Sequence, residues 1–333
     1  MKRGNPVWVW TEQRNNRLME VGIELLGKGL ELSERLNVKL ETILIGNQTG
    51  KLADELMAYG ADTVYMIEDP RLQTYQSDVY ANVLADLIRE HSPEILLIGA
   101  TNIGMDLAPR VAAKVETGLT AHCVDLYIDE DNGIPYLAQI VPGWGGNLMV
   151  KIVCPEKRPQ MATVRPGVLE KPARNEARKG EIVKVTPDIK DGDFKVKPIE
   201  MVEEKAVGMP IEEADTVVAG GWGLFSAGGF KPVEELAEVL GAAVGGTRPA
   251  VDKEWISDDQ MIGQSGKTIS PKLFISVGAS GAMHFTTGFL RSKVIMAIDQ
   301  NPDAPIFKVS DIGLVGDLRE ILPYLIEELK NIV

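Results

Sequence analysis

Apolar runs alternate with helix-period runs through the first 116 residues. The strand-like runs are PVWVWTE, KLETILIG, TVYMIE and EILLIGA, and apolar residues recur at helical spacing over 18–36, 50–60, 78–90 and 104–116. Strands and helices in alternation are typical of a parallel sheet with helices on both faces. The first half of the chain is therefore predicted to be a doubly wound α/β domain.

The pattern changes after Glu116 to short β-like runs broken by glycine and proline: HCVDLYID, YLAQIVPGWGG, LMVKIVC and QMATVRPG. These runs predict antiparallel strands, which we expect to extend the first sheet up to a domain end near Gly167. The next stretch is rich in Lys, Glu, Asp and Pro and predicts a linker with one edge strand at EIVKVTP. The expected division is a first domain over 1–169, a linker over 170–209 and a second domain over 210–333.

A second alternation of strands and helices follows the linker. TVVAGG, AAVGGTR, LFISVGA, KVIMAID and IFKVSDIG predict five strands, with helices over 232–241, 281–290 and 317–330. In such sheets ligands bind outside the carboxyl ends of the strands, near the switch in strand order. The segments there are GGWG, GGTR, GASGAMHF, DQNP and DIGLVGD, so the glycine-rich chemistry gathers on one edge of the predicted sheet.

Charge and cysteine usage narrow the function classes. A net charge of −13 argues against general affinity for nucleic acid or anionic membrane, since both need a basic face. The sequence contains no apolar run near the ~20 residues of a membrane span and no signal-peptide pattern, so a cytoplasmic location is predicted. Cys123 and Cys154 form no C-x-x-C pair, and three histidines are too few to suggest a metal centre, so no metal is expected.

Two glycine-and-hydroxyl turns, GQSGKT and GASGA, lie on either side of LFISV. Met261 stands where a P-loop needs glycine, so we interpret GQSGKT as a loop whose amides and Ser265 hydroxyl hold a diphosphate. GASGA precedes a predicted helix, where free amides bind anions. It also resembles the nucleophile elbow of serine hydrolases, with Ser280 as nucleophile and His284 as the only downstream base, an interpretation we disfavour.

A nicotinamide site is disfavoured at this edge. GGWGLFS has Ser226 where the dinucleotide fingerprint has its last glycine, and the next strand ends in Arg248 where an NAD site needs an acid. Arg248 is either a surface arginine or a cation placed against a ligand, and its place at the carboxyl end of a strand supports the second role.

Together and in this order, GGWG, TRPAVD, IGQSGK, PKLFISVGASGAMHFTTG and NPDAPIFKVSDIGLVGDLREILP resemble the C-terminal half of the α subunit of electron-transfer flavoproteins. GGNLMVKIVCPEKRPQMATVRPGV resembles the family's stretch at the end of the first domain, so the match spans nearly the whole chain. The resemblance implies that the second domain binds one FAD and that the first packs on a β subunit, which would hold a further FAD or AMP. It also implies electron transfer between dehydrogenases and a quinone oxidoreductase or ferredoxin.

The resemblance implies a cofactor site that carries over residue by residue. Thr247 and Arg248 match the family's serine/threonine–arginine pair, with the arginine against the isoalloxazine, where it would stabilise the anionic flavin semiquinone. His284 would act beside it. The loop 262–265 would lie near the flavin and the diphosphate, the turn 280–282 at the start of the helix, and 317–318 at the adenosine end. The matched positions are Trp222, Thr247, Arg248, Ile262, Gly263, Gln264, Ser265, Ser280, Gly281, Ala282, Met283, His284, Phe285, Asp299, Asp317 and Leu318.

Three of these positions depart from the family pattern. Trp222 replaces the arginine of GGRG, and Asp299 replaces a common asparagine. Met283-His284-Phe285 stands where the family has x-Gln-His, so the histidine expected to reach the flavin is displaced by one residue. We expect FAD binding to survive these changes and the flavin potential to differ from that of typical members.

TGLTAHC at 117–123 is similar to TGLTADC of family members that bifurcate electrons, with His122 in place of aspartate. That likeness implies NADH oxidation at a β-subunit FAD, with one electron passing to the α-subunit FAD and one to a low-potential acceptor. The linker over 170–209 would then be a hinge for the second domain. The alternatives left open are a nucleotide-binding regulatory module without redox chemistry and the Ser280 hydrolase.

Overall fold

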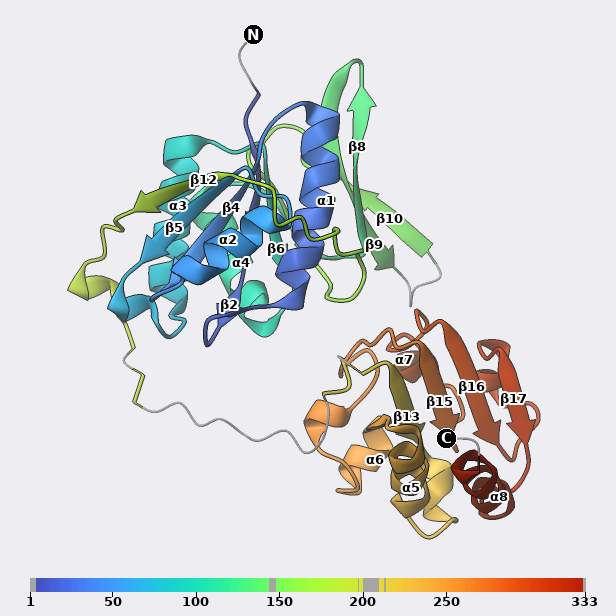
Figure 1. Cartoon of the computed structure of the whole chain (residues 1–333). Helices are drawn as coiled ribbons and strands as arrows, with labels where there is room; N and C mark the ends of the chain where they lie inside the picture. The colour runs from blue at the N-terminus through green and yellow to red at the C-terminus, as the bar shows by residue number, and fades with distance from the viewer. Residues whose placement is uncertain (1–3, 144–147, 197, 200–209, 213, 332–333) are drawn as a thin grey trace. The chain divides into compact units, whose positions relative to one another are not determined.

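The computed structural model describes residues 4–143, 148–196, 198–199, 210–212 and 214–331. The chain divides into two compact units, Met1–Met201 and Val202–Val333. Each unit is built on a parallel sheet with helices on both faces, which confirms the predicted fold class (Figure 1).

The first unit contains a seven-stranded parallel sheet in the order β12-β5-β4-β1-β6-β11-β7. Its strands are β1 (Val7–Trp10), β4 (Leu40–Gly46), β5 (Thr63–Glu68), β6 (Ile95–Gly99), β7 (Leu119–Cys123), β11 (Gln160–Val164) and β12 (Glu181–Val185). Every residue of β1, β4, β6 and β11 is buried, as expected for central strands of a sheet covered on both faces.

Helices cover the two faces of this sheet in pairs. The helices are α1 (Glu20–Leu36), α2 (Gly50–Ala58), α3 (Ser77–His91) and α4 (Asn102–Lys114). Leu25 of α1 and Leu56 of α2 belong to one core cluster, whereas Leu84 of α3 and Leu107 of α4 belong to the other. The apolar stripes of all four helices are thereby buried, and the predicted alternation of strands and helices is confirmed.

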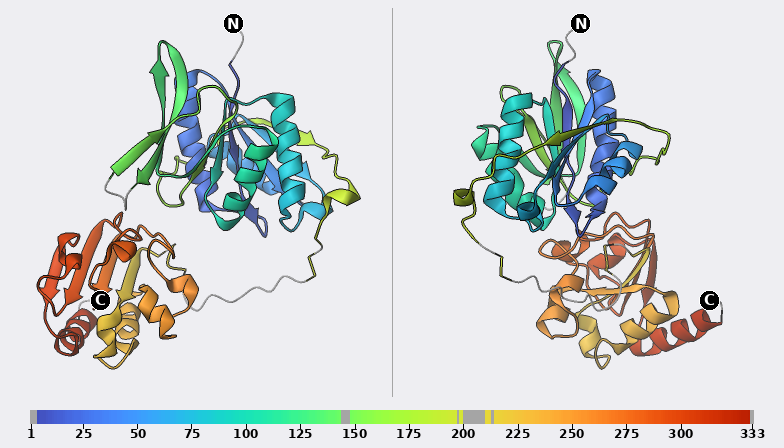
Figure 2. Two further views of the ribbon diagram at one scale, coloured as in Figure 1. Left: turned by 180° about the vertical axis from the view of Figure 1, so that it is seen from behind. Right: turned by 60° about the vertical axis from the view of Figure 1, so that its left-hand side comes forward.

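The antiparallel strands do not extend the parallel sheet, which corrects the sequence-based expectation. β8 (Asp125–Asp131), β9 (Ile134–Gly143) and β10 (Leu148–Ile152) form a separate antiparallel sheet beside α1 (Figure 2), and β2 (Gln13–Arg14) and β3 (Arg17–Leu18) form a short hairpin. β7 and β11 do extend the main sheet, but in parallel orientation. The chain turns back within two residues at Asn132-Gly133, so β8 pairs with β9, and β9 pairs in turn with β10, which makes each strand the partner of its neighbour in the chain.

The edge strand expected within 170–209 is present as β12, which pairs in parallel with β5 at the margin of the first sheet. A short 3-10 helix follows at Asp191–Asp193. The first part of the segment is thus attached to the first unit, while residues 197 and 200–209 lie outside the described residues. The extent of the linker and its role as a hinge stay predictions.

The second unit contains five parallel strands in the order β14-β13-β15-β16-β17. The strands are β13 (Thr216–Gly220), β14 (Ala243–Gly246), β15 (Leu273–Val277), β16 (Val294–Asp299) and β17 (Ile312–Val315). The helices are α5 (Lys231–Leu240), α6 (Arg248–Asp252), α7 (Met283–Thr286) and α8 (Leu318–Lys330), with short 3-10 helices η4 (Trp222–Phe225), η5 (Asp258–Gln260) and η6 (Pro305–Lys308). α5, α6 and α8 pack on one face of the sheet, and α7 and η6 pack on the other.

Two predicted elements of this unit are shorter than expected. The helix predicted over 281–290 is limited to α7, because Gly281 has a φ of +82° before it and i→i+3 turns follow it, with Gly288 N donating to Phe285 O and Phe289 N to Thr286 O, each at 3.0 Å. The strand predicted at IFKVSDIG starts only at Ile312, because Pro305 opens the η6 turn and buries Ile306 in the core. The closing helix predicted over 317–330 is confirmed as α8.

Candidate functional site

The carboxyl ends of the strands in the second unit surround a cavity of about 350 Å³. The chain passes outward from β13 to β14 and then crosses to β15, so the strand order switches between β13 and β15. The loops after these two strands are joined by hydrogen bonds from Gly221 N to Val277 O (2.9 Å) and from Gly223 N to Gly278 O (2.8 Å). The cavity therefore lies where a doubly wound sheet places its ligand.

The turn after β15 offers backbone donors to the cavity. Among the described residues, the amide N–H groups over 279–282 donate to no protein acceptor. Gly281 has a φ of +82°, and a Cβ there would lie 2.5 Å from the Ile306 Cα, so only glycine fits against η6. The Ser280 carbonyl in turn accepts from Ile306 N at 3.0 Å. The turn is therefore held rigidly with its amides free, an arrangement that binds phosphate oxygens.

Thr247 and Arg248 stand at the end of β14 and the start of α6. Thr247 N donates to Gly220 O at 3.0 Å, which fixes the backbone. The Thr247 Oγ1 atom is buried and has no hydrogen-bond partner among the described residues. Arg248 Nη2 donates to Ser265 Oγ at 3.0 Å, which orients the guanidinium over the cavity they both line. A buried hydroxyl without a partner is costly, so its presence here favours a ligand that supplies one.

The loop over 261–267 is tied to the sheet and to α7. Ile262 N donates to Gly246 O at 2.9 Å, and Gln264 N donates to the carbonyl of His284 at 2.7 Å. The Gln264 Oε1 and His284 Nδ1 atoms lie 2.6 Å apart. Lys267, the lysine of the P-loop-like GQSGKT, forms an ion pair with Glu212. This pairing agrees with the sequence-based rejection of a true P-loop.

Two acidic side chains line the far end of the cavity. Asp299, at the end of β16, accepts from Asn301 N at 2.9 Å, and its carbonyl accepts from Gly316 N at 3.1 Å. Asp317 caps α8, and hydrogen bonds from the Arg319 side chain and backbone lower the pKa of its carboxyl to about 2. The free amides and Arg248 therefore supply hydrogen-bond donors to the cavity, and the carboxylates can accept from hydroxyl groups of a ligand.

Trp222 forms an aromatic platform at the cavity. It stacks on Phe225 with ring centroids 5.1 Å apart and an interplanar angle of 1°, and both rings are more than half exposed. Lys253 Nζ lies 5.5 Å from the centroid of each ring. The arginine of the family pattern is thus replaced here by an indole that carries a lysine on its surface, so a positive charge stays near this edge.

The cavity brings together most of the residues predicted from the sequence. Those that line it are Trp222, Thr247, Arg248, Ile262, Gly263, Ser265, Ser280, Gly281, Ala282, His284, Phe285, Asp299, Asp317 and Leu318. Gln264 and Met283 are not part of the lining, and the Phe285 ring is mainly a core group packed against Phe289 at 4.9 Å. Seven further lining residues were not among the predicted site residues. Gly223, Gly278, Ala279 and Gln300 lie in the strand-end segments named from the sequence, whereas Ser226, Pro249 and Met261 do not.

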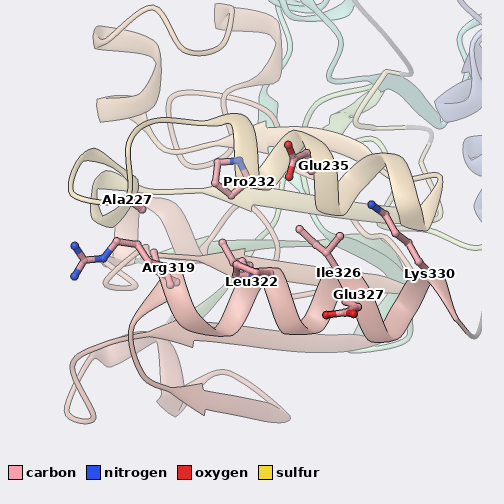
Figure 3. Close-up of a pocket in the computed structure, with 10 residues that line it drawn as sticks. Ala227, Pro232, Glu235, Arg319, Leu322, Ile326, Glu327 and Lys330 are labelled. Atoms are coloured by element: carbon pink, nitrogen blue, oxygen red, sulfur yellow. The ribbon is translucent and has the colours of Figure 1, made fainter.

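A second and larger cavity, of about 480 Å³, lies between α5 and α8 (Figure 3). Leu322 and Ile326 form its apolar wall, and Glu235, Glu327 and Lys330 stand around it (Figure 3). Carboxylates, Lys330 and Arg319 are mixed around it, whereas the strand-end cavity lies at the strand-order switch and is lined by the amides over 279–282 and the Thr247 hydroxyl, which have no partner among the described residues. The strand-end cavity is therefore the candidate site.

The structure also bears on three other possibilities: a serine hydrolase site, a metal site and a membrane-spanning helix. Within the described residues no bond joins Ser280 to His284, whose Nδ1 is paired with Gln264 instead, so no nucleophile–base pair is assembled. No group of three or more His, Cys, Asp or Glu side chains in the described part of the chain could hold a metal ion. Over the same residues, no helix is long and apolar enough to cross a membrane.

Comparison with known proteins gives a consistent family. Residues 7–190 match the electron transfer flavoprotein domain, and residues 210–290 match the electron transfer flavoprotein FAD-binding domain. The α subunit of electron transfer flavoprotein from Thermoanaerobacterium thermosaccharolyticum is 46% identical over 98% of both chains, and that from Megasphaera elsdenii is 43% identical over 98% of this chain and 96% of its own. Subunit LctC of the lactate dehydrogenase (NAD(+),ferredoxin) of Acetobacterium woodii is 40% identical over 98% of this chain and 77% of its own.

Proposed function

The chain belongs to the electron transfer flavoprotein family as an α subunit with an FAD-binding domain, and we propose that FAD occupies the strand-end cavity of its second unit. One observation carries this placement. The buried, unpartnered Thr247 Oγ1, the Arg248–Ser265 pair and the free amides over 279–282 all line one cavity at the strand-order switch. An orphaned hydroxyl, unpaired amides and a glycine-lined turn fit a dinucleotide that supplies phosphate oxygens and carbonyl acceptors.

The bound flavin supplies the redox chemistry and transfers electrons between protein partners. The residues of this chain bind and orient it. Arg248 places a fixed positive charge where negative charge develops on reduction, with Ser265 holding the guanidinium, and the amides over 279–282 hold the diphosphate. Asp299 and Asp317 accept from the hydroxyl groups of the adenosine end.

The cofactor content of the purified protein tests this placement. We expect the chain, purified with its β subunit, to carry tightly bound FAD, and Arg248→Ala combined with Thr247→Val to lower the FAD count per heterodimer by one. Lys272→Ala is the matched control, because it also removes one cation. Lys272 precedes β15, at the edge of the sheet opposite to the cavity, where it pairs with Asp215. An unchanged flavin count in the double variant would show that FAD does not bind in the strand-end cavity.

The finer assignment concerns electron bifurcation. The TGLTAHC segment forms β7, where His122 has a φ of +59° and burial together with the nearby Arg165 lowers its pKa. We propose that a second nucleotide, FAD or AMP, belongs to the β subunit, that a dehydrogenase or NADH is the electron donor, and that a quinone oxidoreductase or ferredoxin accepts the electrons. The name of the Acetobacterium woodii relative, which includes NAD(+) and ferredoxin, supports this route. The cytoplasmic location stays a prediction.

Counting flavins separates the two forms of the proposal. Two FAD molecules per heterodimer, with NADH reducing one of them, support bifurcation, whereas one FAD with AMP supports a conventional carrier. The nucleotide-binding regulatory module would contain no flavin, and no observation in the structure favours it over the electron carrier.

A further inference from the structure

His284 and Gln264 are joined by two hydrogen bonds although they lie twenty residues apart in the chain. The Gln264 amide donates to the His284 carbonyl at 2.7 Å, and the Gln264 side-chain oxygen lies 2.6 Å from His284 Nδ1. His284 lines the strand-end cavity, whereas Gln264 does not. The glutamine therefore contacts the histidine without contacting the space for the ligand.

The backbone around Gln264 is fixed, so the contact is not a chance meeting of two surface side chains. Gly263 has a φ of +135°, and a Cβ there would overlap the His284 carbonyl. Gly263 N donates to Lys267 O at 3.1 Å, and Lys267 N donates to Met261 O at 2.7 Å. These bonds close the loop tightly against the start of α7 and hold the Gln264 side chain beside the imidazole.

The chemistry of an amide oxygen determines which nitrogen carries the proton. A carbonyl oxygen only accepts, so His284 Nδ1 must donate and therefore carries the hydrogen. In the neutral ring the other nitrogen, Nε2, then has a lone pair and no hydrogen. Nε2 is the polar ring atom left for the cavity that His284 lines.

We propose that Gln264 is a positioning residue that holds His284 in the Nδ1–H form, so that Nε2 faces the cavity as a hydrogen-bond acceptor. This inference rests on the proposed function for its ligand, since the imide N–H of an isoalloxazine is the donor that such an acceptor would bind. Arg248 and Ser265 supply donors to the same cavity. The imide edge of an isoalloxazine has an N–H between two carbonyl groups. His284 Nε2 as the acceptor for the N–H, with Arg248 and Ser265 as donors to the carbonyls, would favour one orientation of the ring.

Nuclear magnetic resonance of the imidazole nitrogens tests the proposal directly. The chain contains three histidines, so ¹⁵N-histidine labelling of the full chain with its β subunit, stripped of FAD, gives few signals, and the difference from His284→Gln assigns the relevant pair. At about pH 8 an ordinary imidazole is neutral. We expect wild-type His284 to show a protonated Nδ1 and an unprotonated Nε2.

Variants of Gln264 test whether its side-chain oxygen determines which ring nitrogen of His284 carries the proton. Gln264→Leu removes the acceptor and should release His284 to the Nε2–H form, whereas Gln264→Glu retains an acceptor and should keep the proton on Nδ1. Thr287→Val is the matched control, because Thr287 Oγ1 also contacts the His284 carbonyl, at 3.4 Å, and its removal should leave the ring form unchanged. We further expect Gln264→Leu to weaken FAD binding roughly fivefold, the usual effect of one misdirected hydrogen bond.

The outcomes separate this inference from the proposed function. An Nε2–H form in the wild-type chain, or an Nδ1–H form that persists in Gln264→Leu, would overturn the role of Gln264 even if FAD binds. The Nδ1–H form in a chain that binds no FAD would support the positioning role and refute the proposed cofactor. Circular dichroism checks the folding of Gln264→Leu, which we expect to be retained because the Gln264 side chain is exposed.

Discussion

Replacing Gly281 by alanine tests whether the turn after β15 presents its amides to the cofactor. The new Cβ would lie 2.5 Å from the Ile306 Cα, and the residue would retain a φ of +82°. Left-handed backbone costs a residue with a Cβ about 1–2 kcal/mol, and a tight overlap in a packed region costs about 1–3 kcal/mol more. We therefore expect Gly281→Ala to lower the free energy of unfolding by roughly 2–5 kcal/mol.

Gly228→Ala is the matched control for this change. Gly228 also has a positive φ, +92°, but a Cβ there meets nothing within 4 Å. Its expected loss is the backbone part alone, about 1–2 kcal/mol. The difference between the two variants isolates the contact with η6 from the strain of the left-handed conformation.

Calorimetric FAD titration of the stripped complex and thermal melting are the assays. If the turn shifts to relieve the overlap, at least one charge-assisted bond to the diphosphate is lost, so the dissociation constant should rise about tenfold to a hundredfold. Gly228→Ala should keep the affinity of the wild type. Equal FAD affinities in the two variants would refute the assignment of the turn, whatever their melting temperatures.

Three further changes test other parts of the site. Thr247→Val removes a buried hydroxyl without a partner, so the FAD-free protein should be as stable as the wild type or more stable, while FAD binding weakens roughly fivefold; melting curves with and without FAD measure both effects. Arg248→Gln keeps an amide donor toward Ser265 but removes the positive charge. At ~4 Å and an effective dielectric near 20, that charge would attract a negative charge on the flavin by about 4 kcal/mol. Potentiometry should therefore show the one-electron midpoint potential of the flavin lower by at most about 0.2 V. Hydrogen bonds from Arg319 lower the pKa of the Asp317 carboxyl to about 2, from 3.8 in the unfolded chain. The carboxylate therefore stabilises the fold at pH values above 3.8, and this stabilisation is lost as the pH falls through about 2. Arg319→Leu should raise the pKa of Asp317, which nuclear magnetic resonance of the carboxyl can follow.

The sequence predicted most of the fold because apolar periodicity is a local property. β1, β4 and β6 are continuous buried runs, and α8 starts at a capping aspartate, so their positions follow from nearby residues. The sheet that a strand joins is not determined locally. The strands β8, β9 and β10 pair with their neighbours in the chain, and the turn Asn132-Gly133 between β8 and β9 is a local hairpin signal. That these strands form a sheet of their own instead of extending the parallel sheet depends on packing against distant elements such as α1, which no short window of sequence contains.

The candidate site shows the same limit at the level of side chains. Thr247, Arg248 and the turn over 280–282 were located from their place after strands, since such residues meet at one edge of a sheet. The pairing of Gln264 with His284 was not predictable, because it depends on how the loop folds back on α7. Met261 and Gln300 are both part of the cavity lining and belong to no phosphate-binding motif. Gln300 lies in the strand-end segment DQNP, but nothing in that segment singled out its side chain.

Hydrogen exchange of the backbone amides with and without FAD is the most direct test of the central claim that FAD occupies the strand-end cavity. We expect FAD to slow exchange of the amides over 279–282, which have no acceptor among the described residues, and of the loop over 262–265. Exchange around the cavity between α5 and α8, over 232–240 and 322–330, should be unchanged. Protection confined to those two helices, or no protection in the second unit at all, would contradict the account.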